Sequence, residues 1–155
     1  MERRTPVDQL WFLAKEGTET ERKLQVAGAV FGGMLSAYRN HQELGEDGRK
    51  KDRVNQFGDQ ALRADIEAEE QVLESLKLWA QKANIKLNYR GEEVGKDTFG
   101  IEGGEPYLAL IDGLDGSDNY KNKTDWPYGT MLAVAKGEDP NYEDFEVAGV
   151  ALHEE

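Results

Sequence analysis

Apolar residues recur every three or four positions in two long stretches, and this spacing is typical of amphipathic helices. The stretch at 18–39 has its apolar positions at Leu24, Ala27, Phe31, Met34, Leu35 and Tyr38. Thr18 and Glu21 form a T-x-x-E capping box at its start. Gly32 and Gly33 either weaken this helix or let a neighbour approach closely. A second helix is expected from about Asp59 to Ala83, with an apolar face of Leu62, Ile66, Leu73, Leu76 and Ala80.

The segment between the two helices, residues 40–58, is polar and charged and contains three glycines. This composition favours an exposed loop or a mobile hairpin.

Short apolar runs follow the second helix, at 85–95, 107–113, 129–137 and 145–155. The last run has apolar residues on both parities, which is typical of strands covered on both faces. Two long helices followed by strands predict an α+β fold, with the helices layered on a mostly antiparallel sheet. The last strand is apolar up to Leu152, so we expect either an edge strand or a longer natural chain.

The chain has 155 residues, a net charge of −12 and no cysteine. This length suits one domain, 1–155. The negative charge argues against nucleic-acid and anionic-membrane partners, since both need a positive surface. The lack of cysteine excludes disulfides, thiolate zinc sites and a cysteine nucleophile. The N-terminal region has no apolar run long enough for a signal peptide or membrane span, so a cytoplasmic location is expected.

One strand end carries the sequence IDGLDGSDNY, in which Asp112, Asp115 and Asp118 stand three residues apart. Carboxylates this close repel one another unless a cation lies between them or water screens them. The side chains of Asp112 and Asp115, with the carbonyl of Leu114, offer the oxygen ligands that magnesium prefers. A plain polar turn remains the alternative, because Asp, Gly, Ser and Asn dominate turns.

Other motifs for cations and phosphates do not fit the sequence. An EF-hand register starting at Asp112 would place Leu114 and Lys123 at ligand positions, and no Walker loop or H-E-x-x-H pattern occurs.

Two further acidic positions could join this strand end. Glu92 and Glu93 follow the apolar run at 85–91, and strand ends can converge at one edge of a sheet. Asp65 adjoins the apolar stripe of the second helix, so its side chain could point along the helix edge toward a site. For both, solvated surface acids are the alternative interpretation.

The order of these segments resembles the inositol monophosphatase family, part of the magnesium-dependent, lithium-sensitive phosphatases that include fructose-1,6-bisphosphatases. The matching segments are an acid on the second helix (LRAD), then GEE, then DGLDGS and then WPYG. Gly113 stands where the family pattern has proline. The resemblance extends from about residue 20 to 155 and covers only the first half of a family member.

The resemblance implies hydrolysis of a phosphomonoester by a metal-activated water, with Mg²⁺ as cofactor. Glu93, Asp112, the Leu114 carbonyl and Asp115 would hold the metal, and Ser117 with Glu93 would orient the water. The amides of Gly116 and Ser117 would bind the substrate phosphate. Asp65 would lie in the water-activating network, and the segment 40–58 would close over the metals. A homodimer is also implied.

The family's second half supplies a tryptophan–aspartate segment that completes its second metal site, and this sequence contains no Trp-Asp pair. The expectation is therefore a truncated phosphatase chain that alone binds Mg²⁺ weakly and turns over little. A cation- or phosphate-binding module without catalysis is the alternative. Inositol 1-phosphate, fructose 1,6-bisphosphate and nucleotide 3′-phosphates all remain open as substrates.

Overall fold

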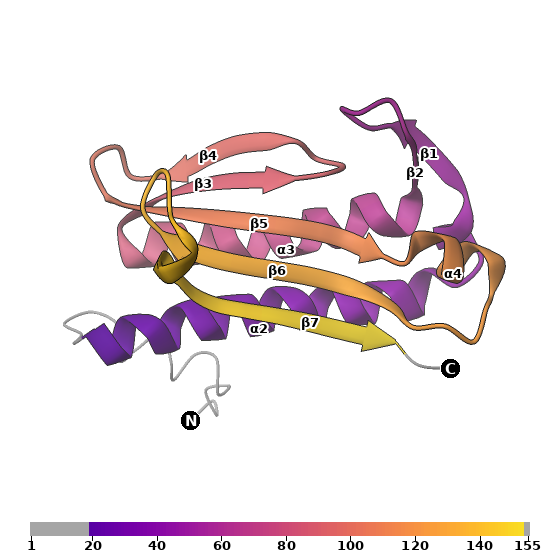
Figure 1. Cartoon of the computed structure of the whole chain (residues 1–155), viewed down its shortest axis with the longest axis horizontal. Coiled ribbons are helices and arrows are strands. Elements are labelled where there is room, and N and C mark those ends of the chain that lie inside the picture. The colour runs from indigo at the N-terminus through magenta and orange to yellow at the C-terminus, as the bar shows by residue number, and fades with distance from the viewer. Residues whose placement is uncertain (1–18, 154–155) are drawn as a thin grey trace, which may run out of the picture.

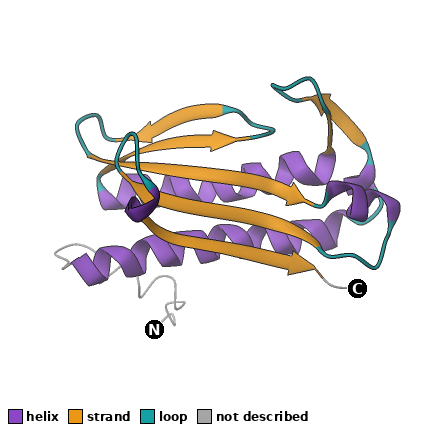
Figure 2. Cartoon of the chain, in the orientation of Figure 1, coloured by secondary structure: helices purple, strands orange, loops and turns teal. Residues whose placement is uncertain are grey.

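The computed structural model describes residues 19–153, in which two long helices lie against one face of a five-stranded sheet (Figure 1; Figure 2). The helices are α2 (Glu19–Leu44), α3 (Arg63–Ala83) and the short α4 (Ser117–Asn122). The main sheet contains β3 (Ile85–Gly91), β4 (Lys96–Gly100), β5 (Glu105–Asp115), β6 (Tyr128–Lys136) and β7 (Phe145–His153). The predicted α+β class is confirmed.

The strand order of the main sheet is β4-β3-β5-β6-β7. Every neighbouring pair is antiparallel except β3 and β5, which run parallel with Arg90 opposite Leu110. The parallel pair points the ends of β3 and β5 in one direction, so the acids that follow them meet at one edge. The last predicted strand is an edge strand of the sheet within the described residues.

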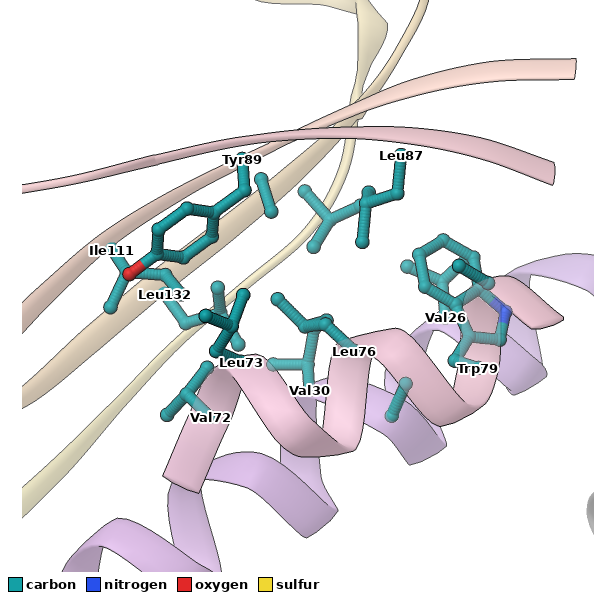
Figure 3. Close-up of a cluster of buried hydrophobic side chains, with 14 of the residues drawn as sticks. Val26, Val30, Val72, Leu73, Leu76, Trp79, Leu87, Tyr89, Ile111 and Leu132 are labelled. Carbon is teal, nitrogen blue, oxygen red and sulfur yellow. The ribbon is translucent and has the colours of Figure 1, made fainter. Parts of the chain in front are cut away.

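The main core lies between the helices and the inner face of the sheet (Figure 3). Trp79 is 1% exposed, and its ring packs edge-on against Tyr107 with centroids 5.2 Å apart. Burial of large apolar side chains of this kind stabilises the layer by about 1.5–3 kcal/mol for each residue. The other labelled core residues are Val26, Val30, Val72, Leu73, Leu76, Leu87, Tyr89, Ile111 and Leu132.

The predicted apolar face of α2 is wrong in part. Leu24 and Phe31 are 48% and 63% exposed, whereas Val26, Ala29, Val30 and Ala37 are buried. A Cβ on Gly33 would lie 3.3 Å from the Cα of Val72, so small residues on this side let α2 approach α3 closely. The face of α2 that carries small residues therefore packs against α3, because it allows a close approach. The helix also continues to Leu44, through Gly32 and Gly33.

The segment between the long helices is a hairpin of β1 (Lys51–Val54) and β2 (Gln60–Leu62), preceded by a 3-10 turn at Asp47–Arg49. The hairpin alternative was therefore correct, although α2 takes the first residues of the segment. The second helix begins at Arg63 rather than near Asp59, because residues 60–62 pair with β1. Strand β4 was not predicted, since its sequence, KDTFG, is polar and exposed. Thr18 of the proposed capping box lies outside the described residues.

The outer face of the sheet carries no long helix of the described part of the chain (Figure 2). Met131, Val150 and Leu152 are 37%, 53% and 50% exposed there. The expectation of strands covered on both faces is therefore not met by residues 19–153. No helix among these residues is long and apolar enough to cross a membrane.

Candidate metal centre

The central aspartates of the site lie at the end of β5. Asp112 and Asp115 flank a shift in the pairing register with β6, an irregularity that re-aims side chains at a strand end. The Asp112 carboxylate accepts a hydrogen bond from the Leu114 N–H at 3.1 Å, which curls the chain back on itself. The Thr130 hydroxyl donates a hydrogen bond to the carbonyl of Gly113 at 2.8 Å and so fixes the turn.

Gly113 lets helix α3 pack directly against this turn. A Cβ at position 113 would lie 2.4 Å from the Asp65 carbonyl oxygen and 2.8 Å from its carboxylate Oδ1. These distances are shorter than any real Cβ contact, so only glycine fits while Asp65 keeps its place. Gly113, which stands where the family pattern has proline, therefore leaves the space that Asp65 occupies. Asp65 is 8% exposed, so it is not a solvated acid on a helix flank.

Glu69, one helical turn after Asp65, is fully buried and holds the end of β3. Its carboxylate accepts hydrogen bonds from the Tyr89 hydroxyl at 2.8 Å and from the N–H groups of Glu93 and Val94 at 3.0 and 2.9 Å. A Cβ on Gly91 would lie 2.2 Å from the Glu69 carboxylate, so the absence of a side chain at position 91 leaves room for that carboxylate. The sequence analysis did not assign Glu69 to the site. Glu69 could have been assigned to the site from the sequence, because it follows Asp65 by four residues and lies among the apolar positions of the helix.

Glu93 projects from this held turn and meets the β1–β2 hairpin. Its Oε1 accepts a hydrogen bond from the Asn55 side-chain amide at 3.2 Å, and that amide also lies 3.4 Å from Glu92. The Gln56 side chain donates to the Gly91 carbonyl at 2.9 Å. Glu93 Oε2 is buried and has no hydrogen-bond partner among the described residues. Glu93 is 8% exposed, which rules out the solvated-turn alternative for it.

All seven predicted site residues line one pocket of about 470 Å³, called the acidic pocket below. These residues are Asp65, Glu93, Asp112, Leu114, Asp115, Gly116 and Ser117. The pocket also receives Asn55, Asp59, Glu92 and Asp118, none of which the sequence analysis assigned a role. The acids at the ends of β3 and β5 thus converge, as expected for strand ends at one edge. Helix α3 and the β1–β2 hairpin complete the lining. The individual roles of these residues stay predictions.

Burial raises the pKa of three carboxyl groups in the pocket, those of Asp65, Glu93 and Asp112. Burial, followed by the charges of Glu93 and Asp112, raises the pKa of Asp65 to about 8. Burial also raises the pKa of Asp112 to about 6, although its hydrogen bond from Leu114 opposes the shift. The pKa of Glu93 is raised by burial and lowered in part by Asn55. A positive charge in the pocket would oppose all three shifts.

The donor set fits a hard divalent cation. Glu93 Oε2 has no partner, and the acidic side chains that line the pocket offer the oxygen atoms that magnesium prefers. Among residues 19–153, however, no three acidic or histidine side chains already stand in a ready ligand arrangement. Binding would therefore require the carboxylates to draw together, which their mutual repulsion opposes without a cation.

The turn after Asp115 places amide groups beside the acids. Gly116 has φ of +79° and precedes α4, so its left-handed conformation starts the helix at Ser117. The first N–H groups of a helix have no partner within it. Because α4 has only six residues, its dipole adds little, and any preference for phosphate would rest on the Gly116 and Ser117 amides themselves.

Comparison with solved structures identifies the fold. The chain matches fructose-1,6-bisphosphatase from Leishmania major in its holo form with a TM-score of 0.63 and 17% identity, over 96% of this chain and 49% of that one. It matches the extragenic suppressor protein SuhB from Bartonella henselae with a TM-score of 0.54 and 20% identity, over 70% of this chain and 40% of that one. No protein-family model and no curated protein matches the sequence.

The fold is therefore that of a part of these proteins, and the resemblance stated from the sequence is confirmed at the level of fold. The chain spans about half the length of the solved structures it matches, or less. At these identities the likeness shows the fold alone.

Proposed function

We propose that the acidic pocket is the magnesium site of a phosphatase, and that this chain carries the metal-binding part of an enzyme that hydrolyses phosphate monoesters. The observation that supports this most is the convergence on one pocket of Asp65, Glu93, Asp112 and Asp115. The pKa values of Asp65, Glu93 and Asp112 are raised, and Glu93 Oε2 has no hydrogen-bond partner among the described residues. Buried like charges without counter-ions destabilise a fold, so their retention favours a functional reason. The fold shared with a fructose-1,6-bisphosphatase is consistent with this chemistry.

Each residue has a role that its position allows. Glu93, Asp112, Asp115 and the Leu114 carbonyl would hold Mg²⁺, which when bound lowers the pKa of water and neutralises phosphate charge.

The remaining groups would bind and orient the substrate. The Gly116 and Ser117 amides would donate to the phosphate oxygens. The Ser117 hydroxyl and the Glu93 carboxylate would position the attacking water, and the Asp65 carboxyl, with its pKa raised to about 8, would accept or hold a proton near neutral pH.

A module that binds Mg²⁺ or phosphate without turnover is the second candidate. One observation favours it: the ligand carboxylates are not preassembled among the described residues. Turnover separates the two candidates, whereas Mg²⁺ binding is common to both.

The test therefore measures Mg²⁺ binding and phosphate release separately. Titration calorimetry with Mg²⁺ would compare the wild type with an Asp112→Asn, Asp115→Asn double variant. Phosphate release would be followed for inositol 1-phosphate, fructose 1,6-bisphosphate and a nucleotide 3′-phosphate, with and without Mg²⁺. We expect the wild type to bind Mg²⁺ weakly, the double variant to lose at least tenfold in affinity, and release by the wild type alone to be small.

A matched control removes two acidic charges elsewhere. Asp139→Asn with Glu143→Gln changes exposed residues of the β6–β7 connection, outside the acidic pocket, and should leave Mg²⁺ affinity unchanged. Equal Mg²⁺ affinity in the wild type and the Asp112, Asp115 variant would contradict the metal site itself. Mg²⁺ binding without any release would favour the binding module.

A further inference from the structure

A second hollow, on the outer face of β3 and β4, differs in charge from the rest of the molecule. It has a volume of about 520 Å³ and is called the basic groove below. Three cationic side chains line it, Lys86, Arg90 and Lys96, in a chain whose net charge is −12. Such a local reversal of sign would concentrate anions there.

Only part of this positive charge is neutralised within the groove. Two carboxylates, Glu138 and Asp97, also line it. The Lys86 ammonium lies 2.6 Å from a carboxylate oxygen of Glu138, whereas the Asp97 carboxylate accepts a hydrogen bond from the Thr98 N–H at 2.7 Å. No ion pair joins Arg90 or Lys96 to any residue in 19–153, and both are exposed. Two neighbouring cations are thus left without a protein counter-ion.

The register of the sheet puts these two cations together. Arg90 of β3 stands directly opposite Lys96 of β4, so their side chains leave the same face at adjacent positions. The Thr98 hydroxyl and the Asn88 side chain, which are hydrogen-bonded at 3.0 Å, form the next polar pair along the groove. Both pairs point away from the core, since Leu87 and Tyr89 point into it.

The same register places this pair beside the acidic pocket. Arg90 is opposite Leu110, and Asp112, two residues further along β5, projects from the same outer face. Strand spacing and rise put the Cα atoms of Arg90 and Asp112 about 8 Å apart. One small ligand could therefore touch both the pocket and the groove.

We propose that Arg90 and Lys96 form an anion subsite, which holds a second anionic group of a phosphate ester whose reacting phosphate lies in the acidic pocket. The proposal rests on the proposed function for the position of the reacting phosphate. A guanidinium binds phosphate and carboxylate in a bidentate manner, and the adjacent ammonium adds a second charge. The subsite therefore selects for substrates with two anionic groups over those with one.

The test is titration calorimetry in the presence of Mg²⁺ with three probes that differ in their second group. Fructose 1,6-bisphosphate carries a second phosphate, 3-phosphoglycerate carries a carboxylate, and glycerol 2-phosphate carries neither. We expect Arg90→Gln, and Arg90→Gln with Lys96→Gln, to weaken binding of at least one two-anion probe by about tenfold or more. Binding of glycerol 2-phosphate should change less than twofold.

Arg39→Gln is the matched control, because it removes the same group from an exposed position of α2. Its affinities should equal those of the wild type, which excludes a general effect of net charge. Loss with the bisphosphate alone identifies a phosphate subsite, and loss with 3-phosphoglycerate identifies a carboxylate one.

Two results would overturn the inference in distinguishable ways. If Arg90→Gln weakens all three probes equally, or none, the subsite does not exist, whatever happens at the metal site. If the two-anion probes bind through Arg90 but are unaffected by Asp112→Asn with Asp115→Asn, the two sites do not share one ligand. Failure of the proposed function is read separately, from Mg²⁺ binding in that double variant.

Discussion

The acidic pocket and a second group of buried polar side chains make an informative contrast. The second group, called the histidine–tyrosine cluster, comprises Tyr38, His41, Tyr120, Tyr128 and His153. His41 Nδ1 lies 3.3 Å from His153 Nε2, and the His153 ring stacks on Tyr38 and Tyr128 at centroid distances of 4.0 and 5.0 Å. Both regions bury ionisable groups, and each leaves one buried atom, His41 Nε2 or Glu93 Oε2, without a hydrogen-bond partner among the described residues. They differ in charge, because only the acidic pocket gathers several groups of one sign.

Burial has opposite consequences in the two regions. Burial, followed by the nearby His153, lowers the pKa of His41 to about 4, so the ring is neutral at pH 7 and contributes no uncompensated charge. In the acidic pocket, burial raises pKa values toward neutrality, and Glu93 Oε2 is left without a partner. A buried ring that is neutral at pH 7 adds no charge to the core and is typical of structure, whereas a set of crowded carboxylates with raised pKa values is typical of a site.

The largest expected effect comes from breaking the scaffold that holds the acidic pocket. Glu69→Ala leaves the Tyr89 hydroxyl and the N–H groups of Glu93 and Val94 without their acceptor. Buried unpaired donors are costly, so we expect a loss of about 4 kcal/mol in the free energy of unfolding. Chemical denaturation would measure it. Glu70→Ala, at an exposed neighbour, should change stability by less than about 0.5 kcal/mol; equal effects would refute the scaffold role.

The pH dependence of the histidine–tyrosine cluster should be almost as large. The folded-state pKa of His41, about 4, lies below its ordinary value of 6.5. The unfolded chain therefore binds the proton first, and stability falls as pH drops from 6.5 to 4, by about 3 kcal/mol for this group. The measurement is the free energy of unfolding against pH for the wild type and His41→Gln. The difference between them should shrink by that amount toward pH 4; parallel curves would argue against it.

The acidic pocket should show the opposite sign without metal. The folded-state pKa of Asp65 is raised to about 8, so the unfolded chain releases the proton first and stability falls as pH rises from about 4 to 8. In metal-free protein at pH 8, Asp65→Asn should therefore increase stability, by about 2 kcal/mol. Asp139→Asn, which removes an exposed acid outside the acidic pocket, serves as the control. A destabilised Asp65→Asn protein at pH 8 would show that the carboxylate is not under electrostatic strain.

The smallest expected effect tests the close approach of α3 to the metal turn. Gly113→Ala places a methyl group against the Asp65 carbonyl, so α3 or the turn must shift, at a cost of about 1–2 kcal/mol. Gly32→Ala is the matched control, because nothing lies within 4 Å of its Cβ and alanine favours the helix. Thermal unfolding should therefore move in opposite directions for the two variants. An unchanged melting temperature for Gly113→Ala would mean that α3 or the turn shifts at no cost in stability.

The placement of single aromatic residues depends on distant contacts. The sequence predicts core or interface packing for Phe31 and Phe145, and packing behind the metal loop for Trp126. Their exposures are 63%, 37% and 72%, so none of the three lies in the core, and an interface for Phe31 or Phe145 stays a prediction. Trp79 alone of the described large aromatics in that prediction is buried. Trp11 and Phe12 lie outside the described residues. His41 and His153 were treated as isolated, yet they pair across 112 positions of sequence.

The amino-acid sequence by itself determined the local features of this protein. These features are the helical and strand periodicity, the acids at the ends of β3 and β5, and the Gly-rich turn before Ser117. Each depends only on neighbouring residues, so it could be predicted without the fold. The tertiary structure alone decided which face of α2 packs on α3 and that Glu69 is buried behind Glu93. It also decided that Arg90 of β3 stands opposite Lys96 of β4. Those outcomes depend on strand register and close packing between segments far apart in the chain, and no local pattern encodes them.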